Sequence, residues 1–242
     1  VSWIEDVHNS WQYSPIRVMD HAFFLGVDLD TDGASVSATL TVLEKEKEQT
    51  DKTARYRLDY IRHHPDLASP DDLADHVQGL VAERPYIGRT TLIVNRSEAP
   101  GQDLVDALTE RGLDPVAATL TEGSGAVSGE ADEVGVHLGT SDAVRTLAEL
   151  SRDGLFAIED HTTEAASRLA RGVQRATEAL DAADANQDTP EAAGSTLDIL
   201  DDVEPHVRSA ALAAWCGTER SFYPSKHLKE DPQTGRPGSQ GR

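Results

Sequence analysis

The fold of this chain is decided by one stretch near its start, Phe23-Phe24-Leu25-Gly26-Val27-Asp28-Leu29-Asp30. A short apolar run of this kind is typical of a buried strand. A carboxylate within it is costly to bury alone, so Asp28 needs a metal ion or a hydrogen-bond donor beside it. The alternative is that Asp28 ends the strand and caps a turn, and we interpret Asp30 and Asp32 as residues of that turn.

Two more strands are expected directly after this run. Residues 34–43 alternate apolar and polar side chains, and residues 54–63 alternate again. The charged segment 44–52 between them is typical of a hairpin tip. Three consecutive strands linked by hairpins therefore open the domain.

The pattern then changes to strands separated by helices. Ser69, Pro70 and the two acids after them are a helix start, because proline suits the first helical position. Further helices are expected at 103–111, 141–152, 163–183 and 203–215, and strands at 91–94, 116–120, 134–138 and 155–158. An antiparallel three-strand meander followed by helix-linked strands predicts an α/β fold of the RNase H-like type, a mixed sheet flanked by helices.

The domain is expected to span residues 21–218, between an N-terminal arm or linker remnant at 1–20 and a flexible tail at 219–242. No apolar run approaches the ~20 residues that cross a bilayer, and the first twenty residues do not resemble a signal peptide. The single cysteine, Cys216, excludes a disulfide framework within the chain. These features indicate an intracellular, cytoplasmic protein.

The composition is strongly acidic, with 43 acidic and 22 basic residues and a formal net charge of -21. Such a field repels phosphate backbones, because nucleic-acid affinity normally comes from cations. The charge indicates either an acidic chelating or partner-binding surface or a halophilic protein adapted to a salty cytoplasm. In the second case the charge says little about partners, since the Debye length is ~3 Å at 1 M salt.

An RNase H-like nuclease needs carboxylates from three distant segments that converge on the sheet. Together they hold two divalent ions, which activate water and stabilise the leaving oxygen of a phosphodiester. Hard oxygen ligands favour Mg or Mn. Asp28 fits the first of these positions, in the first strand.

Several segments of the chain resemble the nuclease domain of viral terminase large subunits, which cut concatemeric DNA during packaging into tailed-virus capsids. The resemblance runs in order from residue 22 to 217. Its main segments are Tyr60-Ile-Arg-His-His64, the helix from Pro70, Leu92-Ile-Val-Asn95, residues 101–112, and Leu113-Asp-Pro-Val-Ala-Ala-Thr-Leu-Thr-Glu-Gly123.

The resemblance implies a site and also two departures from it. The family's second acid falls on Asn95, and Glu98 lies three residues further on. The third acid falls on Asp201-Asp202 or, in a gapless match from Trp215, on Glu204. The implied catalytic residues are Asp28, Asn95, Asp202 and Glu204. The implied Mg or Mn ligands are Asp28, Asp201, Asp202 and Glu204. Acids before a helix are also expected there for dipole stabilisation alone.

Two functions follow from this resemblance. The first is a metal-dependent DNA endonuclease domain of a packaging terminase, with double-stranded DNA, an ATPase motor, a portal and a small terminase subunit as partners. No GxxxxGK[ST] phosphate loop occurs in the chain, so the motor would lie elsewhere. The second is a catalytically degenerate domain used for DNA docking or motor assembly, which Asn95 favours.

Other features suggest weaker alternatives. Gly26 to Gly33 resembles the first phosphate loop of actin-like kinases, but a second such loop is not found in the sequence. Arg168, Arg171 and Arg175 follow helical spacing and either contact a phosphate backbone or balance the acids on a solvated face. His63, His64 and His206 are metal ligands or proton carriers in one interpretation and ordinary surface or core residues in the other.

Overall fold

The computed structural model describes residues 19–32, 35–48, 53–66, 69–121, 126–128, 135–185 and 203–219. Most of the expected arm and tail lies outside these ranges, although residues 19 and 20 belong to the first strand and residue 219 to the last helix. No helix among the described residues is long and apolar enough to cross a membrane.

The described strands form one mixed sheet of eight strands in the order β6-β7-β5-β4-β1-β2-β3-β8. Strands β1, β2 and β3 form the expected antiparallel meander. Strands β4, β5 and β7 continue the sheet in parallel from β1, while β6 pairs antiparallel with β7 and β8 parallel with β3. The bounds are β1 Met19–Asp32, β2 Ser35–Glu48, β3 Ala54–His64, β4 Thr90–Asn95, β5 Val116–Thr121, β6 Ala126–Ser128, β7 Val136–Gly139 and β8 Phe156–Ala157.

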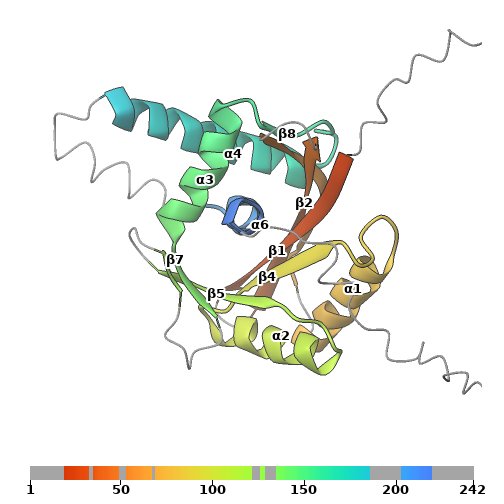
Figure 1. Ribbon diagram of the computed structural model, residues 1–242. Coiled ribbons are helices and arrows are strands. Elements are labelled where there is room, and N and C mark those ends of the chain that lie inside the picture. The colour runs from red at the N-terminus through yellow and green to blue at the C-terminus, as the bar shows by residue number, and fades with distance from the viewer. Residues whose placement is uncertain are drawn as a thin grey trace, which may run out of the picture.

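Helices cover both faces of this sheet (Figure 1). Helices α1 (Pro70–Ala82) and α2 (Ala99–Glu110) pack on one face around the apolar side chains that include Leu25 and Val27. Helices α3 (Thr140–Arg152), α4 (Glu164–Ala185) and α6 (Pro205–Glu219) pack on the other face. The predicted α/β class is therefore confirmed, and the mixed sheet with its opening meander is consistent with an RNase H-like fold.

The first hairpin is longer than the sequence predicts. Asp30 and Asp32 are not turn residues, because β1 continues to Asp32, which pairs with Ser35. The charged residues 44–48 likewise belong to β2 and not to a hairpin tip. The strands continue through Asp30 and Glu44 because their charges find partners: Asp30 pairs with Arg208 of α6, and Glu44 pairs with Arg57 of β3. Residues 126–128, where the sequence predicts no strand, form β6.

Helix α6 is the centre of the second layer, seen end-on in the middle of Figure 1 between the sheet and helices α3 and α4. Most of its side chains are buried, which is typical of a helix enclosed on all sides. It lies close to β1: a Cβ built on Gly26 would be 2.0 Å from the backbone oxygen of Ser209. The Ser209 hydroxyl also hydrogen-bonds the Thr41 hydroxyl of β2 at 2.7 Å.

We expect Gly26→Ala to lower the free energy of unfolding by about 3 kcal/mol, since the new methyl group must push α6 away from the sheet. Gly79→Ala is the matched control, because a Cβ on Gly79 in exposed α1 meets nothing within 4 Å. That variant should gain about 0.5–1 kcal/mol of stability. Urea unfolding of both variants is the measurement, and equal effects would refute the close contact between α6 and β1.

Candidate functional site

A row of polar side chains crosses the sheet on the face covered by α6. Asp28 of β1 pairs with Thr39 of β2, and Thr39 pairs with His63 of β3. On the other side of β1, Val27 pairs with Val94, so Asn95 at the end of β4 lies beside Asp28. The structure therefore brings together Asp28 and Asn95, the residues onto which the resemblance places the first two site positions.

Asp28 is fully buried, with 0% of its surface exposed. Its Oδ1 accepts a hydrogen bond from Asn95 Nδ2 at 2.8 Å, and its Oδ2 accepts one from Arg208 Nε at 2.9 Å. Arg208 Nη2 also lies 3.3 Å from Asp30 Oδ2. Burial raises the pKa of Asp28, while the Arg208 charge and the Asn95 amide lower it in part. A guanidinium thus supplies the positive charge beside this carboxylate.

The amide of Asn95 is oriented by its neighbours in the following turn. Its Oδ1 accepts hydrogen bonds from the Ser97 backbone N–H at 3.1 Å and from the Ser97 hydroxyl at 2.6 Å. The Ser97 hydroxyl oxygen in turn accepts the backbone N–H of Leu120 on β5. The amide oxygen therefore faces Ser97 and the amide N–H group faces Asp28. In this orientation Asn95 is a donor to the carboxylate and offers it no further negative charge.

The other predicted acids are not brought to Asp28. Asp201 and Asp202 lie outside the described residues. Glu204, just before α6, accepts a hydrogen bond from Arg175 of α4 at 2.8 Å. Glu98 accepts one from the Thr31 hydroxyl. Because side chains alternate along β1, Thr31 lies on the opposite face of the sheet from Asp28, so the Glu98 carboxylate does not substitute for the missing acid.

Arg208 is the site residue that the sequence reasoning missed. It is the one Lys or Arg between Pro205 and Cys216, a stretch that otherwise consists mostly of small and apolar residues. A lone guanidinium in a buried helix requires an acidic partner. This requirement is the feature of the sequence that could have identified Arg208 as a site residue. The acids nearest to Arg208 in the sequence lie at the start of α6, whereas its partner in the structure is Asp28, which is 180 residues away in the sequence.

The predicted basic stripe on α4 is largely paired with acids. Arg168 donates to Glu164 one turn earlier, and Arg175 donates to Glu204. Arg171 is exposed between them. Two of the three guanidinium groups thus form ion pairs with carboxylates of the same molecule. The positive potential along the stripe is therefore weaker than its sequence suggests.

One group of described side chains could hold a metal ion, His21, Glu44 and Glu46, whose ligand atoms all lie within 4.8 Å of one another. By strand alternation this group is on the α1 and α2 face, opposite Asp28. His21 Nδ1 lies 2.7 Å from Glu44 Oε1, and Arg57 also contacts Glu44. The group is separate from the predicted nuclease site, and a guanidinium already balances its charge.

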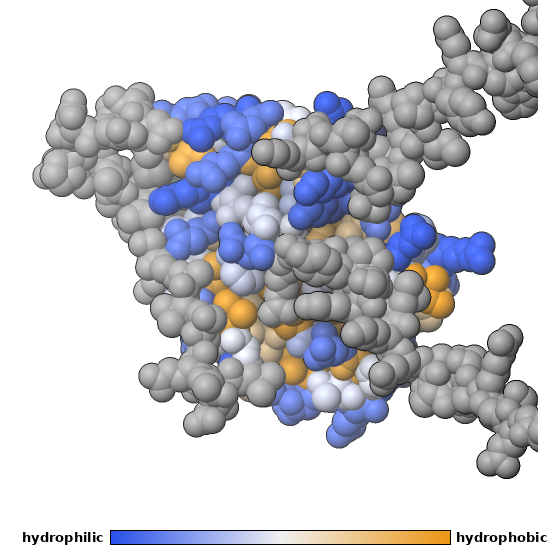
Figure 2. All heavy atoms as spheres, viewed as in Figure 1, coloured by the Kyte–Doolittle hydropathy of each residue, from blue (hydrophilic) through white to orange (hydrophobic). Residues whose placement is uncertain are grey.

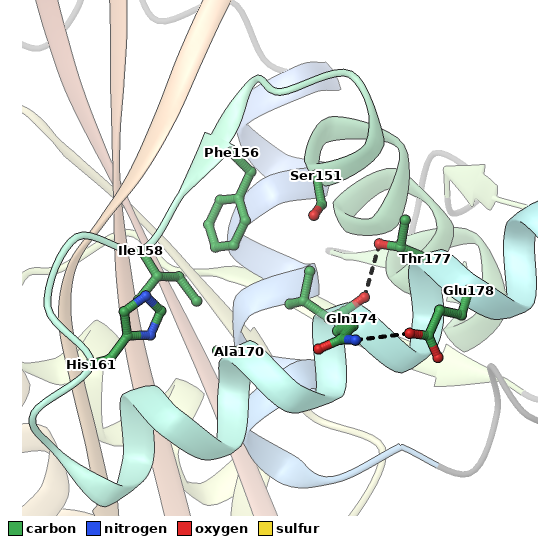
Figure 3. Close-up of a pocket in the computed structure, with 9 residues that line it drawn as sticks. Ser151, Phe156, Ile158, His161, Ala170, Gln174, Thr177 and Glu178 are labelled. Carbon is green, nitrogen blue, oxygen red and sulfur yellow. Dashed lines mark hydrogen bonds between the residues drawn. The ribbon is translucent and has the colours of Figure 1, made fainter.

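Two cavities open on the α3, α4 and α6 side of the sheet. Figure 3 shows the first, of about 320 Å³, where Phe156 and Ile158 lie opposite the side chains of α4. Gln174 donates to Glu178 at its rim at 2.8 Å. The second, of about 500 Å³, is lined by His63 and His206 and lies at the β3 end of the polar row. Only the second shares a residue with that row.

Comparisons with known proteins do not assign the chain to a family: no family model matches it, and neither the curated proteins nor the solved structures contain a match.

We expect Arg208→Met to destabilise the fold in a pH-dependent manner. Without the guanidinium, burial raises the pKa of Asp28 in the folded state further above its unfolded value. A group shifted in this direction contributes stability below its unfolded pKa and loses it as the pH rises. The deficit relative to wild type should therefore grow between pH 4 and pH 7, to about 3–5 kcal/mol.

Replacing both partners, Asp28→Leu with Arg208→Met, should recover most of this loss, because no charge is then left buried alone. Arg111→Met is the matched control: its side chain is 20% exposed against 22% for Arg208, but its partner carboxylates Asp71 and Asp75 are 74% and 70% exposed. It should lose much less stability, with little change between pH 4 and pH 7. Chemical denaturation across this pH range is the measurement, and parallel pH profiles for Arg208→Met and Arg111→Met would contradict the interpretation.

Proposed function

We propose that this chain is a catalytically inactive RNase H-like domain, related to the nuclease domains of viral terminase large subunits, that serves in assembly of a packaging machine. The observation that carries the proposal is the ion pair between Asp28 and Arg208, with the Asn95 amide on the second carboxylate oxygen. Both oxygens of the carboxylate that would bind a catalytic metal ion accept hydrogen bonds from side chains of the same chain.

The donors at this position do not fit a pair of Mg or Mn ions. Such ions need several negatively charged oxygens that converge from different segments. Here each oxygen of Asp28 accepts a hydrogen bond, the amide oxygen of Asn95 faces Ser97, and Arg208 adds a positive charge. A divalent cation at this place would be repelled by the guanidinium, so we derive no hydrolytic step from it.

The charge distribution favours a protein partner over DNA. The net charge of -21 opposes binding to a phosphate backbone. On the face seen in Figure 2, hydrophilic side chains are widespread and apolar ones form small separate groups. Two arginines of the α4 stripe are paired with glutamates. An ATPase motor subunit, a portal or a small terminase subunit with a basic surface is therefore the expected partner class.

A supercoiled-plasmid nicking assay with Mg or Mn tests this proposal. Wild type and Asp28→Asn should both show only background cleavage, because the site holds no metal-activated water. Mn-dependent nicking by wild type that is lost in Asp28→Asn would refute the proposal and favour the metal-dependent endonuclease. A gel-shift assay with duplex DNA at 0.1 M salt should show no complex, and a stable complex would contradict the preference for a protein partner.

A second experiment introduces beside Asp28 the charges that a metal site would need. Asn95→Asp combined with Arg208→Leu removes the guanidinium and puts two carboxylates side by side, so calorimetry should detect micromolar Mn binding that wild type lacks. The same pair of changes with Asp28→Asn is the control and should bind Mn weakly. Equal Mn affinity in wild type and the double variant would show that Arg208 does not block the site.

A further inference from the structure

The second cavity is a polar pocket at the β3 end of the row that contains Asp28. It has a volume of about 500 Å³ and lies where the end of β3 meets the first turns of α4 and α6. Its lining residues are Ile61, Arg62, His63, Pro65, Glu164, Ala165, Arg168 and His206. Neither Asp28 nor Arg208 is among them, so the pocket is a separate feature from the ion pair.

Two imidazoles face each other at this pocket. The rings of His63 and His206 are 5.1 Å apart between centroids, with 36° between their planes. His63 Nδ1 lies 2.9 Å from the Thr39 hydroxyl. His206 is only 3% exposed, and its buried Nδ1 has no hydrogen-bond partner among the described residues. Because an unpaired N–H is costlier to bury than an unpaired acceptor, the tautomer with its proton on Nε2 is favoured, which leaves Nε2–H as the donor for a bound molecule.

Burial lowers the pKa of His63, and the charge of Arg168 lowers it further. The charge of Asp30 acts in the opposite direction and raises this pKa. Burial also lowers the pKa of His206, with His63 and Arg168 acting in the same direction and Glu204 and Glu164 opposing them. Both rings are therefore neutral at pH 7, and a neutral imidazole carries one N–H donor and one acceptor nitrogen.

The charges around the rings favour an anion over a metal ion. Arg168 lines the pocket, and Glu164 is the one acid among its lining residues. Arg62 also borders the pocket, but strand alternation directs its side chain to the α1 and α2 face, near His64 and His76. Glu164 is already bound to Arg168 at 2.6 Å. A divalent cation between the imidazoles would be repelled by Arg168, which is near enough to affect both rings. An anion would be attracted by the Arg168 guanidinium.

We propose that this pocket binds the phosphate group of a small phosphate monoester. The Arg168 guanidinium matches phosphate oxygens with parallel N–H donors, and the Nε2–H group of His206 adds a donor beside it. The apolar lining, Ile61, Pro65 and Ala165, provides a surface for the organic part of the ester. The proposal concerns a site outside the Asp28 ion pair and stands independently of the assembly role.

Binding at this site is coupled to protonation. A dianion beside His63 and His206 raises the pKa of both rings, so the complex takes up protons and affinity rises as the pH falls from 8 toward 6.5. Below about pH 6 the phosphate itself becomes a monoanion and affinity falls again. The groups that set this balance are Asp30 on the sheet, Glu164 and Arg168 on α4, and Glu204 at the head of α6.

The test is calorimetric titration of the full chain with phenyl phosphate and with inorganic phosphate at 0.1 M salt. Phenyl phosphate should bind more tightly than inorganic phosphate, and more tightly at pH 6.5 than at pH 8. Arg168→Gln should weaken its binding about tenfold or more, since a charge-assisted contact is lost. Arg171→Gln, one turn along the same helix and outside the pocket, is the matched control and should change affinity by less than about twofold.

A second readout separates binding from a loss of structure. Histidine ring signals in NMR spectra should show two imidazoles whose pKa rises when phenyl phosphate is added to the wild type, and this rise should be absent in Arg168→Gln. Equal affinity for inorganic phosphate and phenyl phosphate would overturn the ester assignment. Equal weakening by Arg168→Gln and Arg171→Gln, or binding of Zn²⁺ with no binding of either phosphate, would overturn the site.

Discussion

The structure depends on how one carboxylate, Asp28, is kept in the middle of a buried sheet. A charge at 0% exposure is tolerated only when donors and an opposite charge surround it. Asn95 supplies a donor from the neighbouring strand, and Arg208 supplies the charge from the last helix. This ion pair joins two segments that are 180 residues apart, so it holds α6 in one register on the sheet.

The close approach of α6 makes that ion pair possible. Gly26, two residues before Asp28, lets the helix backbone come near β1, and the hydrogen bond between Ser209 and Thr41 holds the same turn against β2. Arg208 is adjacent to Ser209 in the chain. The contact that fixes Ser209 against β2 therefore also positions Arg208 beside Asp28. Helices α3 and α4 then pack against α6, and the second layer of the domain is built around this helix. The contact that holds the second layer on the sheet thus also places the guanidinium beside Asp28.

The two ends of the polar row differ in what they offer to other molecules. At the Asn95 end, carboxylate, amide and guanidinium satisfy one another, which leaves little capacity for a ligand. At the His63 end, two neutral imidazoles and the Arg168 guanidinium line a cavity. The groups that can contact a ligand therefore lie two strands away from Asp28, beside β3.

The sequence by itself determined the buried first strand, the three-strand meander, the helix-linked strands after it and the proximity of Asp28 to Asn95. The strands and helices follow from local periodicity and turn chemistry, whereas the proximity of Asp28 to Asn95 was expected from the resemblance to terminase nuclease domains. The full length of the first hairpin was not predictable, because Asp30 is stabilised in β1 by an arginine far along the chain. The partner of Asp28 and the pairing of His63 with His206 were also decided only by the tertiary structure. Both depend on where α6 crosses the sheet, and that position is set by backbone contact at Gly26 and by packing of small side chains, which leave no periodic signal in the sequence.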